Sequence, residues 1–148
     1  MNNPIVYGNN SALKSISERL LNLADTLNAA ADVALECDHD GVLFVAFSLL
    51  EAASEHAHAW GENLPKKGLA LADQPDVLQD SATAAIDRLG AFIEGAALAI
   101  SKAAHVGQKP SVERQALIDS MNGMNTEIEV VRRAVESLSL PAHAVASV

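Results

Sequence analysis

Apolar residues recur along the chain at alternating steps of three and four, the spacing that places side chains on one face of an α-helix. Four stretches show this pattern, at about residues 11–37, 42–60, 75–105 and 111–139. The first is marked by Leu13, Ile16, Leu20, Leu23, Leu27, Ala30 and Ala34. The second is marked by Leu43, Ala46, Leu50, Ala53, Ala57 and Trp60. Each stretch is long enough to predict a helix of its own.

The third and fourth stretches carry equally regular apolar positions. In the third these are Leu78, Ala82, Ala85, Leu89, Phe92, Ala96, Ala99 and Ala103, widened on one side by Ile86, Ile93 and Ile100. In the fourth they are Leu117, Met121, Met124, Ile128, Val131, Val135 and Leu138. No segment alternates as a strand would. Four helices joined by three connections predict an all-α fold, an antiparallel four-helix bundle made of two helical hairpins.

Proline, glycine and capping residues suggest where these helices begin and end. Asn10 or Ser11 can cap the first helix, which leaves residues 1–10 as an N-terminal arm. Gly61 and Pro65 are expected to end the second helix.

The remaining boundaries follow from the same signals. Residues 62–74 are expected to form a linker, and Pro75 to open the third helix. Pro141 stops the fourth, so residues 141–148 are expected to be a flexible tail. The whole chain is interpreted as one domain, a size at which roughly 70% of the unfolded chain's surface becomes buried.

Composition narrows the class of protein. Hydrophobic residues make up 49% of the 148 residues, and only 3% of the residues are aromatic. Many of the apolar residues are alanine, and alanine-rich helices can pack closely. Cys37 is the only cysteine, which excludes an intrachain disulfide. The longest apolar run, residues 42–50, is far shorter than the ~20 residues of a membrane span, and the N-terminus lacks signal-peptide order. These features favour a cytoplasmic protein that does not bind a membrane.

One short stretch resembles a metal site. Glu51, Glu55, His56 and His58 lie close together in the second helix, and Glu55-x-x-His58 has a spacing used by di-metal bundles. Such sites need two Glu-x-x-His pairs whose ligands point into the core, and the other such spacing in this chain, Glu36-x-x-His39, runs into the expected turn after the first helix. The helical period places Glu51, Glu55 and His58 opposite the apolar stripe, with His56 at its border. We therefore expect no metal and no other cofactor.

Charge is unevenly distributed. The net charge is −9, and no Lys or Arg occurs between Leu20 and Pro65. Acidic residues recur on the expected outer faces of the first and third helices: Glu18, Asp25, Asp32 and Glu36, and Asp80, Asp87 and Glu94. They are either solvated surfaces that keep the bundle soluble or a binding surface for a basic protein. Direct binding of nucleic acid is disfavoured because no basic patch is present.

The third helix has a second apolar side made of small residues and one leucine: Ala84, Gly90, Ala91, Ala97 and Leu98. A single bundle would leave this strip partly exposed, and a two-fold homodimer would cover it. Alternatively, residues 61–76 or the terminal arm around Ile5 and Tyr7 could fold over it.

Together these patterns predict a non-catalytic helical module for protein interaction or regulation, such as an acidic inhibitor of a basic, nucleic-acid-handling protein. The alternative is a metal-binding or carboxylate-dependent helical-bundle enzyme that uses Glu51, Glu55 and His58.

Overall fold

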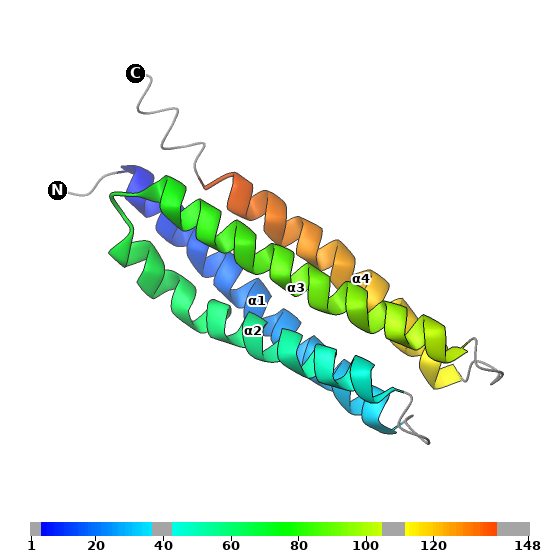
Figure 1. Cartoon of the computed structure of the whole chain (residues 1–148). Coiled ribbons are helices and arrows are strands. Elements are labelled where there is room, and N and C mark those ends of the chain that lie inside the picture. Colours follow the sequence, from blue (N-terminus) through cyan, green and yellow to red (C-terminus); the bar gives the residue numbers. More distant parts are fainter. Residues whose placement is uncertain (1–3, 37–42, 105–111, 139–148) are drawn as a thin grey trace.

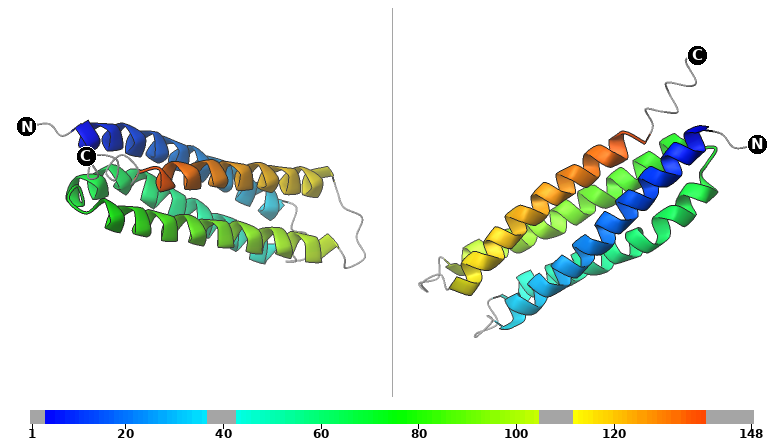
Figure 2. Two further views of the ribbon diagram at one scale, coloured as in Figure 1. Left: turned by 90° about the horizontal axis from the view of Figure 1, so that it is seen from above. Right: turned by 180° about the vertical axis from the view of Figure 1, so that it is seen from behind.

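The computed structural model describes the backbone of residues 4–36, 43–104 and 112–138, and the side chains of residues 11–36, 43–102 and 115–138. The described backbone forms four helices, α1 (Pro4–Glu36), α2 (Phe44–Ala70), α3 (Pro75–Ala104) and α4 (Val112–Glu136). Figure 1 shows them as an elongated antiparallel bundle. Helices that follow each other in the chain pack together, most extensively α1 and α2, and α4 also packs against α1, so α1 and α3 lie diagonally opposite (Figure 2). The predicted all-α bundle is confirmed.

The apolar stripes meet along the axis of the bundle. All seven stripe residues of α1 are buried, as are the six of α4 and Leu138 just beyond its end, and Leu27 has no exposed surface. In α2 the buried positions are mostly small: Ala46, Leu50, Ala53, Ala57, Gly61, Leu64 and Gly68. Small side chains let two helix backbones approach closely, so α1 and α2 form the closest helix pair of the bundle.

The start of α1 differs from the expected boundary. The helix begins at Pro4, so residues 4–10 belong to α1 rather than to an arm, and the expected caps Asn10 and Ser11 lie inside the helix. Proline is favoured in the first turn of a helix, where its missing N–H would have no intrahelical partner. The apolar stripe begins only at Leu13, which is why the periodicity placed the boundary too late.

The end of α2 also differs. The helix continues through Gly61 and Pro65 to Ala70, so most of the expected linker is helical and only residues 71–74 connect α2 to α3. Leu64 and Gly68 are buried and continue the inward-facing stripe beyond Trp60. Burial of this additional apolar face outweighs the helix-breaking tendency of the glycine and the proline.

Gly61 serves packing rather than termination. A Cβ at this position would lie 2.8 Å from Leu21 Cγ and 3.2 Å from the Leu21 backbone nitrogen. A Cβ at Gly68 would likewise overlap the Leu13 side chain. Both glycines therefore lie where α2 touches α1, and their lack of a side chain permits that contact.

Pro65 removes a hydrogen bond that another part of the chain replaces. In an α-helix the carbonyl of Gly61 would accept from the N–H of residue 65, and proline has none. The hydroxyl of Ser17, on α1, donates to this carbonyl instead. Ser17 is buried, with 7% of its surface exposed. The right-hand view of Figure 2 shows α2 curving along its second half, as expected for a helix with an internal proline.

Ser17→Ala is therefore expected to lower the free energy of unfolding by roughly 1 to 2 kcal/mol, because the buried Gly61 carbonyl loses its donor. Urea denaturation followed by circular dichroism measures this, with the exposed Ser15→Ala as the matched control. In a Pro65→Ala background the cost should shrink, since residue 65 then supplies an N–H. An equal cost in both backgrounds would contradict this role of Ser17.

The other boundaries agree with the expected positions to within a few residues, and α3 begins at Pro75 as predicted. Leu43 occupies the N-cap position of α2 without a side-chain capping bond. The expected tail at residues 141–148 and the stop at Pro141 lie outside the described residues.

Candidate functional site

The Glu and His residues of α2 do not converge. His56 is partly buried and points toward α3, where its Nε2 lies 3.0 Å from the Ala85 carbonyl oxygen. Because a carbonyl only accepts, Nε2 carries the proton and donates it. The His56 ring also meets the edge of Phe92, with ring centres 6.2 Å apart. His56 therefore joins α2 to α3.

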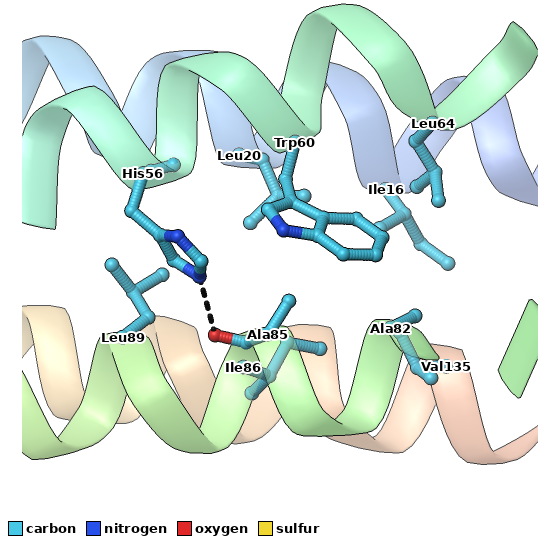
Figure 3. Close-up of a pocket in the computed structure, with 11 residues that line it drawn as sticks. Ile16, Leu20, His56, Trp60, Leu64, Ala82, Ala85, Ile86, Leu89 and Val135 are labelled. Carbon is cyan, nitrogen blue, oxygen red and sulfur yellow. Dashed lines mark hydrogen bonds between the residues drawn. The ribbon is translucent and has the colours of Figure 1, made fainter. Parts of the chain in front are cut away.

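A small cavity lies beside His56 and Trp60. Figure 3 shows side chains from all four helices around it, including Ile16, Ile86 and Val135. Its volume is about 10 Å³, roughly the space that one water molecule needs. Except for His56 and Trp60, the lining is aliphatic. This cavity is too small for an organic substrate.

The remaining members of the group face solvent. Glu51, Glu55 and His58 are exposed, and His58 Nε2 lies 3.0 Å from Glu62 Oε1, one turn further along α2. Within the side chains that the structure describes, no three His, Cys, Asp or Glu residues are grouped so that they could hold a metal ion.

The two histidines should respond differently to truncation. His56→Ala is expected to cost about 1 to 2 kcal/mol, because it removes the bond to Ala85 and the contact with Phe92. His58→Ala, at an exposed position, should change stability by less than about 0.5 kcal/mol. Urea denaturation monitored by fluorescence of Trp60, the only tryptophan, compares them. Equal effects would contradict the orientation of His56.

The acidic residues of α1 are exposed and have no cationic partner among the side chains that the structure describes. Glu18, Asp25, Asp32 and Glu36 all face solvent, and among the described residues none of them lies within an ion-pair distance of a Lys, Arg or His. Arg19, the nearest cation in sequence, pairs instead with Glu127 of α4 at 2.9 Å. No cation of the described part of the chain thus compensates the carboxylates of α1.

The acidic residues of α3 differ in one respect. Asp80, Asp87 and Glu94 are exposed, but Asp87 pairs with Arg132 of α4. The hydrogen bond to Asp87, with a further contribution from Glu129, raises the pKa of Arg132 above its ordinary value. Since α1 and α3 are diagonal in the bundle, the acidic residues of α1 and those of α3 lie on opposite sides and do not form one surface.

The acidic surface of α1 continues onto α2 instead. Asp25 and Asp32 lie on the same side of α1 as Leu21, which contacts Gly61 of α2. Glu51 precedes Ser54 by one turn, and the Ser54 hydroxyl donates to the Ala24 carbonyl at 2.7 Å. Carboxylates of both helices therefore flank the line where α1 and α2 meet. We call this the acidic face: Asp25, Asp32 and Glu36 of α1, and Glu51 and Glu55 of α2.

An open groove of about 410 Å³ runs between α1 and α4. Arg19, Asn22 and Thr26 line it from α1, and Ser120 and Glu127 from α4. The charges of Arg19 and Glu127 are already paired with each other. The groove thus lacks an unpaired acid and base that could act together in catalysis.

The strip on α3 is partly exposed in the single chain. Ala84 and Ala91 are exposed, and Leu98 has 56% of its surface exposed. Gly90 and Ala97 are half-buried. A Cβ at Gly90 would meet no atom within 4 Å. Residues 61–70, expected as one possible cover, belong to α2, and their buried glycines pack on α1. The alternative cover around Ile5 and Tyr7 belongs to α1, and its side chains lie outside those described.

Self-association through this strip therefore stays a prediction. We expect sedimentation equilibrium at micromolar concentration to show a dimer, and Ala91→Arg to convert it to a folded monomer, because a buried charge without a partner is costly. A monomer of 15.5 kDa for the wild-type protein would contradict it.

Sequence reasoning missed two features of α1 and α2 at the acidic face. Glu51 and Glu55 were grouped with the histidines as metal candidates, whereas they extend the acidic face of α1. Leu35 and Phe44 are large apolar residues with 50% and 57% of their surface exposed. A strict heptad count could have identified both residues as off the apolar stripes.

In the described stretches, no helix combines the length and the apolar character that crossing a membrane requires. No family model matches the chain, and neither a curated protein nor a solved structure matches it.

Proposed function

We propose that this protein is a non-catalytic interaction module that binds a basic protein through the acidic face. The supporting observation is the contrast in pairing. Across Leu20–Pro65 the chain supplies no Lys or Arg, and the carboxylates of the acidic face have no cationic partner among the described residues. On the opposite hairpin, Arg132 bridges Asp87 and Glu129.

An uncompensated acidic face attracts a positively charged surface and speeds its association. A protein that handles nucleic acid has such a surface, and occupying it would exclude phosphate. The module could then inhibit its partner while binding no nucleic acid itself. We place this function in the cytoplasm, since the composition favours that compartment, and it is compatible with a homodimer formed through α3 on the other side of the bundle.

The alternative, a metal-binding or carboxylate-dependent enzyme, has less geometric support. His56 is engaged by Ala85 and Phe92, and His58 lies beside Glu62 in solvent. The cavity near His56 has space for about one water molecule.

The test is affinity capture from the host's lysate over a series of salt concentrations, with captured proteins identified by mass spectrometry. The acidic-face variant carries Asp25→Lys and Glu55→Lys. The matched control carries Asp80→Lys and Glu94→Lys on α3, which changes the net charge equally. We expect the wild-type protein to capture one basic protein at low salt and to lose it at high salt. At low salt the acidic-face variant should fail to capture that protein, and the control should retain it. Capture that ignores both the acidic-face charges and the salt would overturn the proposal.

A further inference from the structure

Two large apolar side chains are exposed at one end of the α1–α2 pair. Leu35 lies in the last turn of α1, and Phe44 is the first residue of α2. Leu35 has 50% of its surface exposed to solvent, and Phe44 has 57% exposed. The Phe44 ring lies next to that of Phe47, with centres 6.1 Å apart, and Phe47 is packed against the core. Phe47 thus links the exposed Phe44 ring to the core.

The register of the two helices places Leu35 and Phe44 at the same level. Ser17 bonds to Gly61, and Ser54 bonds to Ala24, which fixes how the antiparallel helices are aligned. Continuing that alignment brings Leu35 level with the start of α2. Leu35 also follows Ser17 by eighteen residues, or five full turns, so it lies on the side of α1 that faces α2.

Carboxylates surround this apolar pair. Asp32 lies one turn before Leu35, and Glu36 follows it directly. Phe44 precedes Glu51 by seven residues and is therefore on the same stripe of α2. Asp32, Glu36 and Glu51 are exposed and have no cationic partner among the described side chains. An apolar centre with an acidic rim is complementary to an apolar stripe with basic flanks.

We infer that Leu35 and Phe44 anchor one amphipathic basic helix of a partner protein. Aliphatic residues of that helix would lie on the apolar pair, and its Lys or Arg side chains would reach Asp32, Glu36 and Glu51. A helix can lie along the furrow between two packed helices and present residues one turn apart to it. This inference rests on the proposed function, and it adds where the partner binds and what chemistry it brings.

The probe is a synthetic amphipathic helix with leucine along one face and lysine on its flanks. A peptide of the same composition in scrambled order is the control. Amide chemical shifts of the isotope-labelled full-length protein are recorded while each peptide is added. We expect shifts concentrated at the end of α1 and the start of α2, and weaker binding of the scrambled peptide. Shifts centred on Leu98 and Ala91 of α3, or equal binding of both peptides, would overturn the inference.

Variants separate the anchor from the charges. Phe44→Gln combined with Leu35→Gln should weaken binding about tenfold, since truncating a central apolar anchor commonly has an effect of that size. Leu98→Gln, at an equally exposed leucine on α3, should have less than about a twofold effect. Phe44→Gln alone serves if the double variant folds poorly.

Asp32→Lys with Glu51→Lys tests the acidic rim. If these reversals weaken binding but the glutamine variants do not, the anchor is refuted while the proposed function stands. If neither set has an effect, both fail. If the wild-type protein is a dimer that the glutamine variants dissociate, a second copy occupies this surface, and the partner helix is refuted.

Discussion

Replacing Leu27 by alanine should lower the free energy of unfolding by roughly 2 to 5 kcal/mol. Leu27 lies in the middle of α1 and has no exposed surface. Its truncation removes buried apolar surface and leaves a cavity that the surrounding helices fill only in part. Because a domain of this kind is stable by about 5 to 15 kcal/mol, the change would be a large fraction of the total.

The measurement is urea denaturation, in which the midpoint should fall while the slope stays unchanged. Leu69→Ala is the matched control, since Leu69 lies on α2 with 69% of its surface exposed. The control should stay within about 0.5 kcal/mol of the wild-type protein. A Leu27→Ala midpoint equal to that of the control would show that the packing of α1 differs from the described core.

Gly61→Ala should also destabilise the protein, by roughly 1 to 3 kcal/mol. Alanine is a better helix former than glycine by about 1 kcal/mol, but here its Cβ would lie 2.8 Å from Leu21 Cγ. Helices α1 and α2 would have to separate, and the hydrogen bond from Ser17 to the Gly61 carbonyl would lengthen. The packing cost therefore exceeds the gain in helix propensity.

Gly90→Ala is the matched control with the opposite sign. Gly90 lies in the interior of α3, and a Cβ there would meet no atom within 4 Å. This substitution should stabilise the protein by about 0.5 to 1 kcal/mol. Thermal unfolding of both variants by circular dichroism decides the matter. Stabilisation by Gly61→Ala would mean that α1 and α2 are not in close contact at this point.

The sequence predicted the four helices and nearly all of the core because periodicity reports directly on burial. Leu13 through Ala34 and Leu117 through Leu138 are buried at every stripe position named from the pattern alone. Periodicity depends only on the helix that carries it, so no knowledge of the neighbours is needed.

The end of α2 could not be predicted from the same information. Gly61 and Pro65 are local signals for termination, and only the neighbouring helix makes them compatible with a helix interior. Leu21 occupies the space beside Gly61, and Ser17 satisfies its carbonyl, yet both residues are about forty positions away in sequence. Tertiary contacts of this kind override local propensity.

The candidate site was predicted in part for a related reason. Composition and spacing identified the acidic residues of α1 and α3, but which of them share a surface depends on which helices are neighbours. The diagonal placement of α1 and α3 separates their acidic residues, and the contact of α1 with α2 brings in Glu51 and Glu55. The direction of His56 likewise depends on the backbone of α3 at Ala85.

The C-terminal turn of α1 has a consequence of its own. Aligned peptide dipoles give the end of a helix a partial negative charge, which basic side chains usually offset. The last turn of α1 contains no basic residue, and the helix ends at Glu36 with Asp32 one turn earlier. Negative side chains there repel the helix end, so salt should stabilise this part of the bundle rather than weaken it. A cation bound at this end would remove the same repulsion, and binding there would therefore also tighten the helix.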